Sequence, residues 1–198
     1  MRKIHLLPNP LDQFQLWYEE TKAQKQEADM DAMILATVSE AGKPSARVVL
    51  FKGIDQGGFL LYTNYQSRKA VQLVANASAA LVFYWPTVYK QIRIEGQAQK
   101  ITREASEKYF QSRPYESQIS AWVSPQSQEV PDREYLLTRY KTYQGKFTKD
   151  TIPCPEYWGG FRLIPDYMEF WIGQDHRLHD RFCYQQKKGQ WQIIRLAP

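Results

Sequence analysis

The 198-residue chain has few cysteines and no long apolar run. Its two cysteines, Cys154 and Cys183, form no CxxC motif and no cysteine–histidine cluster, so we expect free thiols rather than a disulfide framework. The longest apolar stretch, residues 79–85, is much shorter than the ~20 residues that cross a bilayer. Pro8 and Asp12 interrupt the N-terminal region before an apolar segment of signal-peptide length can form. We therefore expect a cytoplasmic protein.

The chain also lacks the glycine-rich motifs that bind phosphate groups through the backbone. No GxGxxG follows a strand-like segment and no GxxxxGK[ST] occurs, which excludes the doubly wound nucleotide-binding folds. Acidic residues are scarce between residues 41 and 94, where Asp55 is the only acid among seven basic residues. This basic segment fits a solvated surface, a nucleic-acid surface or a pocket for small anions, and composition does not choose between them. A phosphate bound here would be held by side chains.

Composition and periodicity predict one domain, spanning residues 1–198, with a mainly β fold. Hydrophobic residues make up 43% of the chain and charged residues 24%, which is typical of a globular domain. Most predicted strands are joined by tight turns, and so many antiparallel strands usually close into a barrel, here with peripheral helices. Helices are expected at residues 10–21, 68–76, 102–112 and 131–145. Strands are expected at residues 33–38, 47–51, 59–63, 79–84, 90–101, 162–164, 167–171, 182–186 and 190–196.

Three groups of residues are candidates for binding an anion. Arg47 and Lys52 bracket an apolar strand, although strand alternation points them to different faces unless a bulge intervenes. Ser67-Arg68-Lys69 places two cations on the first turn of a helix, where a bound phosphate would offset their unfavourable interaction with the helix dipole. Tyr109 and Arg113 are four residues apart near a helix end, with Ser117 expected in the loop that follows. For each group, an ordinary surface arrangement is the alternative.

Two of the three histidines lie in the segment Asp175-His176-Arg177-Leu178-His179-Asp180-Arg181. Their HxxH spacing is compatible with a metal site, but the neighbouring arginines disfavour a cation and no cysteine or glutamate completes a ligand set. We therefore expect no metal. If the segment is extended, Arg177, His179 and Arg181 share one face and suit an anionic or electron-rich ligand.

Several ordered motifs along the chain resemble those of the pyridoxamine 5′-phosphate oxidase family. The motifs are Arg47-Val-Val-Leu-Phe-Lys52, Tyr62-Thr63, Ser67-Arg68-Lys69, Tyr109-Phe-Gln-Ser-Arg113-Pro114, Ser117-Gln118-Ile119, Trp122-Val123-Ser124, Gln126-Ser127, Trp158-Gly-Gly-Phe-Arg162, Glu169-Phe-Trp171, Arg177-Leu-His-Asp-Arg181 and Arg195-Leu-Ala-Pro198. The resemblance implies an FMN-binding split barrel that forms a homodimer, with FMN at the subunit interface. It also implies an oxidase that converts pyridoxamine or pyridoxine 5′-phosphate to pyridoxal 5′-phosphate in vitamin B6 metabolism, with O2 as electron acceptor and H2O2 as product.

The resemblance also implies roles for individual residues. The FMN contacts would be Arg47, Val48, Val49, Leu50, Phe51, Lys52, Tyr62, Thr63, Arg68, Lys69, Gln91, Gln126, Ser127, Trp171 and Arg181. The substrate phosphate would be held by Lys52, Tyr109, Arg113 and Ser117, and the substrate ring would lie against Arg177, Leu178 and His179. Arg177 and His179 would be the catalytic residues. Two alternatives remain, namely a flavoprotein oxidase for another substrate, as in phenazine synthesis, and a basic barrel that binds nucleic acid.

Overall fold

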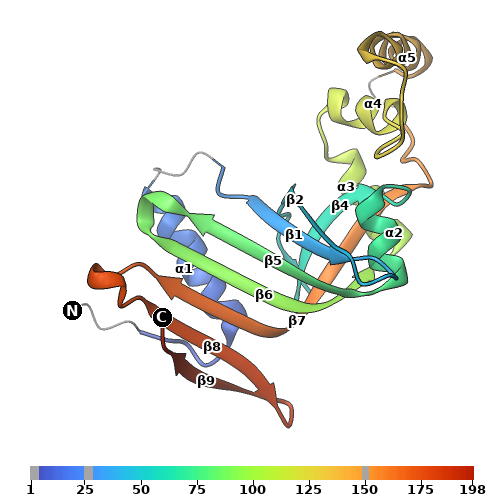
Figure 1. The fold of residues 1–198 in the computed structure, drawn as a ribbon. Helices are drawn as coiled ribbons and strands as arrows, with labels where there is room; N and C mark the ends of the chain where they lie inside the picture. Colours follow the sequence, from blue (N-terminus) through green and yellow to red (C-terminus); the bar gives the residue numbers. More distant parts are fainter. Residues whose placement is uncertain (1–4, 25–28, 149–151) are drawn as a thin grey trace.

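Nine antiparallel strands form one sheet in the computed structural model, which describes residues 5–24, 29–148 and 152–198 (Figure 1). The strands are β1 (Ala32–Val38), β2 (Pro44–Leu50), β3 (Ile54–Asp55), β4 (Gly58–Asn64), β5 (Ser78–Trp85), β6 (Lys90–Lys100), β7 (Trp158–Ile172), β8 (Asp180–Lys187) and β9 (Gln190–Leu196). Their order is β2-β1-β5-β6-β7-β4-β3, with β8 paired to both β7 and β9.

The long strand β7 divides the sheet into two parts. One side of β7 pairs with β6 along its length, whereas the other side pairs first with β4, through residues 158–163, and then with β8, through residues 167–172. The register of β6 and β7 shifts between Glu95 and Gly96. A Cβ atom on Gly96 would lie 2.0 Å from the Ile164 carbonyl oxygen, so only glycine fits this close approach.

Backbone hydrogen bonds beyond the end of β2 close the barrel. The Lys52 N–H donates to the Leu60 carbonyl at 2.9 Å, and the Leu60 N–H donates to the Gly53 carbonyl at 2.9 Å. These bonds join the residues that follow β2, at one edge of the strand order, to β4, which lies next to β3 at the other edge. The antiparallel barrel predicted from the sequence is therefore confirmed.

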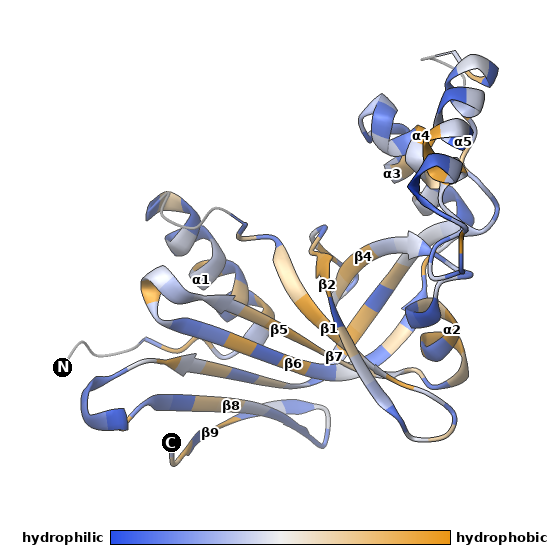
Figure 2. Cartoon of the chain, turned by 45° about the horizontal axis from the view of Figure 1, so that its top comes forward, coloured by the Kyte–Doolittle hydropathy of each residue, from blue (hydrophilic) through white to orange (hydrophobic). Residues whose placement is uncertain are grey.

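Five α-helices surround the sheet in the described part of the chain. They are α1 (Pro10–Gln24), α2 (Arg68–Ala75), α3 (Arg103–Gln111), α4 (Tyr115–Val123) and α5 (Arg133–Lys146), and two short 3-10 turns span Pro86–Val88 and Asp175–Arg177. Helix α1 buries Phe14 against the rings of Phe51, Phe59 and Phe83, with centroid distances of 4.8 to 5.3 Å. Figure 2 colours much of β1, β2 and β5 as hydrophobic. Helices α4 and α5 stand at the end of the molecule opposite β8 and β9 (Figure 1).

Three elements differ from the sequence-based expectation. The two-residue strand β3 was not predicted. Helix α4 was not predicted, and Ser117 lies in its first turn rather than in a loop, because Pro114 serves as the N-cap from which the chain resumes a helix. Residues 162–164 and 167–171 belong to one continuous strand, β7, because Pro165 lies at the register shift, where the ladder is already interrupted.

Both cysteines are buried free thiols, as expected. No helix among residues 5–24, 29–148 and 152–198 is long and apolar enough to cross a membrane.

Candidate functional site

A cavity of about 520 Å³ opens between strands β2 and β4 and helices α3 and α4. We call it the cation cavity, because its charged lining residues are Lys52, Lys69 and Arg113 and none of the described residues that line it is acidic. Its volume lies within the usual range for a small-molecule site. The lining consists of Val48, Val49, Leu50, Lys52, Tyr62, Thr63, Asn64, Lys69, Tyr109, Arg113, Pro114, Ser117, Ser120, Ala121, Ser124, Gln126 and Trp158.

Lys69 lies at one end of the cation cavity among neutral oxygen atoms. Its Nζ is 3.3 Å from the Thr63 hydroxyl, the Ser67 hydroxyl and the Gln126 Oε1. Burial lowers the pKa of the Lys69 ammonium, and the nearby Arg47 guanidinium lowers it further. No ion pair joins Lys69 to a carboxylate in the described part of the chain. A bound anion would supply the missing negative charge.

Arg47 lies beside Lys69 and is also without a carboxylate. Its guanidinium donates to the Leu35 carbonyl at 3.0 Å, the Thr37 hydroxyl at 2.7 Å and the Ser45 hydroxyl at 2.6 Å. Burial and then the charge of Arg68 lower the pKa of Arg47. The three cations Arg47, Arg68 and Lys69 therefore come together from β2 and the first turn of α2. The N-terminus of α2 adds its own free N–H groups, since the Ser67 side chain caps none of them.

The opposite end of the cavity holds Arg113 against a stack of aromatic rings. Tyr62 and Tyr109 are parallel at 3.8 Å between centroids, and Trp158 continues the stack at 5.5 Å from Tyr62. The Arg113 guanidinium lies 4.6 Å from the Trp158 ring. Its buried Nη1 has no hydrogen-bond partner, and burial lowers the pKa of the group. An orphaned buried donor on a cation marks a position where an anionic ligand would bind.

Lys52 and Ser117 complete this end of the cavity. Lys52 lies just beyond β2, and its Nζ is 4.0 Å from the Asp31 carboxylate, whose other oxygen accepts a hydrogen bond from Tyr18. Ser117 lines the cavity from the first turn of α4. Strand alternation predicted that Arg47 and Lys52 point to different faces. Their positions agree with this prediction, because Arg47 donates a hydrogen bond to β1 whereas Lys52 lines the cavity.

A second group of predicted residues lies on the far part of the sheet. Gln91 pairs with Trp171, and Trp171 pairs with Arg181, so β6, β7 and β8 place the three side by side in one cross-strand row, which we call the β6–β8 row. Arg181 donates to the buried Glu169 carboxylate at 2.7 Å, and Arg93 lies 3.5 Å from the same carboxylate. The hydrogen bond that Arg181 donates to the Glu169 carboxylate raises the pKa of the Arg181 guanidinium.

The loop between β7 and β8 carries Arg177, Leu178 and His179 beside this row. The Trp171 and His179 rings are 4.7 Å apart, and the Gln174 N–H donates to Nδ1 of His179 at 3.1 Å. A neutral His179 therefore carries its proton on Nε2. The extended stripe expected for residues 177–181 is wrong, because Asp175–Arg177 forms a 3-10 turn in which His176 and Arg177 have φ of 57° and 61°.

The structure thus separates the predicted residues into two sets within one chain. The cation cavity contains Val48, Val49, Leu50, Lys52, Tyr62, Thr63, Lys69, Tyr109, Arg113, Ser117 and Gln126. Arg47, Arg68 and Ser127 adjoin it in space or sequence, and Phe51 is 6% exposed in the hydrophobic core. Gln91, Trp171, Arg177, Leu178, His179 and Arg181 do not line it.

The two sets of residues lie near opposite ends of the long strand β7. Trp158, in the cavity wall, and Trp171, in the β6–β8 row, lie near opposite ends of the 15-residue strand (Figure 1). At ~3.3 Å per residue, the path along the strand between them is about 40 Å. The two sets therefore lie at opposite ends of β7 in the same chain.

Trp158 is the main residue of the site to which no role was assigned from the sequence. It precedes Gly159, where a Cβ atom would lie 2.2 Å from the Tyr65 hydroxyl, so the chain needs glycine at this position. The motif Trp158-Gly-Gly was visible in the sequence, but its contact with Arg113 depends on residues 45 positions apart.

Comparisons with known proteins agree with this geometry. The family model described as pyridoxamine 5′-phosphate oxidase matches residues 19–147, and the pyridoxine 5′-phosphate oxidase C-terminal dimerisation region matches residues 158–198. The chain belongs to the pyridoxamine 5′-phosphate oxidase family. Two curated relatives carry the name pyridoxine/pyridoxamine 5′-phosphate oxidase. One, from Coxiella burnetii, is 62% identical with 100% of both chains covered, and one, from Teredinibacter turnerae, is 48% identical with 100% of this chain and 93% of the relative covered.

Solved structures support the same family fold. PhzG from Burkholderia lata 383, solved in complex with tetrahydrophenazine-1-carboxylic acid, superposes with a TM-score of 0.93 at 28% identity, covering 99% of this chain and 98% of that chain. A pyridoxamine 5′-phosphate oxidase-related, FMN-binding protein from Nostoc punctiforme superposes with a TM-score of 0.77 at 16% identity, covering 98% and 100%. The fold is therefore the split barrel of this oxidase family, and the match to the dimerisation region supports a homodimer.

The residues present fit FMN, the cofactor of this oxidase family. A phosphate monoester requires several charge-assisted donors, and Lys69, Arg47 and Arg68 supply them beside the free N–H groups of α2. Neither Lys69 nor Arg47 forms an ion pair with a carboxylate among the described residues, and burial lowers the pKa of both groups. The apolar side chains Val48, Val49 and Leu50 line the same cavity, where a flat ring system would be desolvated.

Proposed function

We propose that this protein oxidises pyridoxamine or pyridoxine 5′-phosphate to pyridoxal 5′-phosphate, using FMN and O2 and releasing H2O2. The observation that carries the proposal is the cation cavity, with two separate sets of cations and no acidic lining residue in the described chain. Two sets of cations suit two phosphate groups, one on the cofactor and one on the substrate. When bound, FMN supplies the hydride acceptor and passes the electrons to O2.

The phosphate of FMN would be held by Arg47, Arg68 and Lys69, with Thr63, Gln126 and Ser127 beside them. Lys69 already contacts Thr63 and Gln126, so these neutral groups hold its ammonium in place before the anion binds. The strand residues 48–52 and Tyr62 would contact the rest of the cofactor. Pre-positioned donors reduce the cost of ordering side chains on binding.

The phosphate of the substrate would be held by Lys52, Tyr109, Arg113 and Ser117. The Arg113 Nη1 is buried without a partner, and the Tyr109 hydroxyl comes from the ring stacked on Tyr62. A hydroxyl, a guanidinium and an ammonium that converge from separate elements can hold a dianion without a glycine-rich loop. This grip would set the position of the substrate ring.

The β6–β8 row of one subunit would complete the site of the other. Gln91, Trp171 and Arg181 would contact FMN, and the residues 177–179 would lie against the substrate ring. The row lies on a sheet face that also exposes Tyr84 (54%) and Val48 (66%), which a second subunit would cover. His179, with Nε2–H as its free donor, would orient the oxygen substituent of the ring, and Arg177 would cover its outer face.

A purified sample tests the proposal directly. The protein should be yellow, should release FMN on heating, and should form pyridoxal phosphate from pyridoxamine phosphate only when O2 is present. A colourless protein that takes up no added FMN would contradict the proposal, and salt-dependent binding to single-stranded nucleic acid would support the alternative of a basic barrel.

The likeness to PhzG makes a phenazine-type substrate the second candidate. The proposed substrate-phosphate contacts argue against a phenazine-type substrate, because a substrate without a phosphate would leave Arg113 buried and unpaired. A phenazine precursor turned over faster than either phosphorylated vitamer would favour this alternative.

A further inference from the structure

Residues 152–157 form neither a helix nor a strand, and they lead directly into Trp158, which lines the cation cavity at the start of β7. Pro153 and Pro155 have no N–H to donate, so the segment cannot complete a strand ladder. Its carbonyl groups are instead bound by side chains. The Ile152 carbonyl accepts from Gln111 at 3.0 Å, and the Pro153 carbonyl accepts from the Trp122 indole at 2.9 Å.

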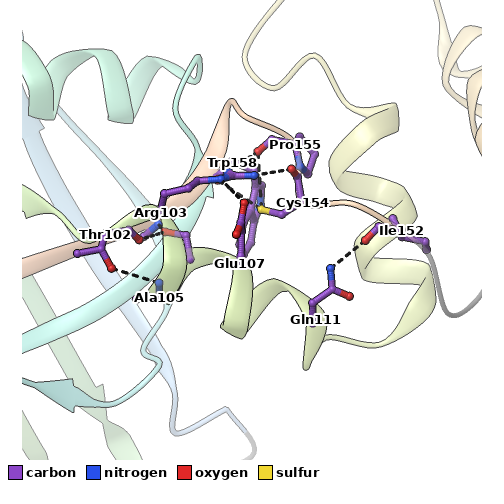
Figure 3. A network of polar contacts seen from close by, with 11 residues as sticks. Thr102, Arg103, Ala105, Glu107, Gln111, Ile152, Cys154, Pro155 and Trp158 are labelled. Carbon is purple, nitrogen blue, oxygen red and sulfur yellow. Dashed lines mark hydrogen bonds and ion pairs between the residues drawn. The ribbon is translucent and has the colours of Figure 1, made fainter.

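Arg103 makes the largest number of these contacts (Figure 3). Its Nη2 donates to the Cys154 carbonyl at 2.6 Å, and its Nη1 donates to the Pro155 carbonyl at 2.9 Å and to the Trp158 carbonyl at 3.1 Å. Its Nε binds the Glu107 carboxylate at 2.7 Å, one turn along α3. One planar guanidinium therefore fixes three carbonyl groups from two nitrogen atoms in a rigid fork, a geometry that the single nitrogen of a lysine ammonium does not reproduce.

The contacts continue from Trp158 to the phosphate grip. Trp158 is 5% exposed and stacks with Tyr62 and Tyr109. The Arg113 guanidinium lies over its indole at 4.6 Å, and no ion pair to a described carboxylate holds Arg113 in place. The orientation of the Arg113 guanidinium is therefore set mainly by the indole ring of Trp158. Arg103 in turn binds the backbone carbonyl of Trp158.

We propose that Arg103 is a positioning residue for the substrate phosphate, acting through Trp158 on Arg113. Arg103 contacts neither the cavity nor the proposed ligands, since it does not line the cavity. The inference rests on the proposed function, because it assumes that Arg113 binds the phosphate. It adds a residue outside the site that controls the affinity for phosphorylated substrates.

The test measures steady-state kinetics of FMN-saturated Arg103→Gln and Arg103→Lys. We expect the KM for pyridoxamine phosphate to rise about tenfold or more in both variants, since small displacements of a binding group have large effects. The kcat should change by less than about threefold, because the proposed contacts to the substrate ring, at residues 177–179, lie elsewhere. The inhibition constant of inorganic phosphate should rise by the same factor as KM, and the FMN content should stay at the parent level.

Glu107→Gln is the matched control. It removes the ion pair to Arg103 but leaves the three carbonyl contacts, so KM should stay within about twofold of the parent. A double variant sharpens the test. Arg103→Gln should add nothing to the KM of Arg113→Gln if Arg103 acts through Arg113.

Each other outcome overturns the proposal. If the two substitutions raise KM independently, so that their factors multiply in the double variant, Arg103 does not act through Arg113. If Arg103→Gln lowers FMN content, kcat and thermal stability together without a specific rise in KM, Arg103 has only a structural role. If Arg113→Gln raises KM and Arg103→Lys does not, the positioning role is wrong while the proposed function stands. If Arg113→Gln itself leaves KM unchanged, the proposed phosphate site fails, and the positioning role with it. Should Arg103→Gln not fold, the lysine variant decides.

Discussion

The cation cavity and the β6–β8 row differ in whether carboxylates pair with their cations. In the cavity, burial lowers the pKa of Lys69 and Arg113, and neither forms an ion pair with a described carboxylate. In the row, Arg181 and its neighbour Arg93 share the buried Glu169 carboxylate, and Arg93 also forms an ion pair with Glu95. The cavity therefore keeps positive charge for a ligand, whereas the row is neutralised within the protein and presents Trp171 as a flat contact surface.

The largest expected effect comes from removing the unpaired charge at the substrate end of the cavity. Arg113→Gln should lower kcat/KM for pyridoxamine phosphate by about hundredfold, because a desolvated charge pair contributes ~2–5 kcal/mol. The change should be mainly in KM. Arg133→Gln, at the exposed start of α5, is the control and should have no effect. Equal kinetics of the two variants would contradict the phosphate role of Arg113.

Mixed dimers test whether the two regions meet only across subunits. Arg113→Gln alters the cavity and Arg177→Ala alters the loop beside the row, and each homodimer should be nearly inactive. A dimer with one copy of each has one site with both substitutions and one with neither, so it should recover about half the parent activity. Dimers isolated with two different affinity tags provide the measurement. Activity that stays at the level of the homodimers would mean that both residues serve the same chain's site.

A smaller effect is expected at the cofactor end of the cavity. Lys69→Met should weaken FMN binding about tenfold, because charge-assisted hydrogen bonds contribute ~1.5–3 kcal/mol and Arg47 and Arg68 remain. Quenching of flavin fluorescence on titration of the FMN-free protein gives the affinity. Lys43→Met, in the exposed turn between β1 and β2, should bind FMN like the parent. Unchanged affinity in Lys69→Met would remove this residue from the proposed phosphate contacts.

The smallest effect concerns the pH dependence of stability. Burial lowers the pKa of Lys69 in the folded protein, whereas the unfolded chain keeps the ordinary value of ~10.4. At a pH between these two values, Lys69 is more protonated in the unfolded chain than in the folded protein. Stability from this group therefore rises with pH in that window. The Tm of the FMN-free parent minus that of Lys69→Met should increase between about pH 7 and about pH 9.5, below the range where tyrosines titrate. Inorganic phosphate should flatten this increase, and a decreasing difference would contradict the assigned environment.

Local patterns in the sequence were sufficient for most of the fold. Apolar spacing placed α1 and α2 within a few residues of their observed bounds, and tight turns indicated antiparallel pairing. Helix α4 was missed because Pro114 was interpreted only as the end of α3. The extended conformation considered for residues 177–181 is not formed at Arg177, whose left-handed backbone has no signal in its residue type, whereas that of His176 has only a weak one.

The sequence by itself determined that phosphate groups must be held by side chains, since it has no glycine-rich phosphate loop, and which cations were available. Family resemblance, not spacing, assigned their roles. Only the tertiary structure decided which cations stay without a counter-charge, because the partner of Arg181 is twelve residues away on another strand and Arg113 has an indole instead of a carboxylate. Pairing and burial are properties of contacts between distant segments, and they decide which positive charges remain free to bind a ligand.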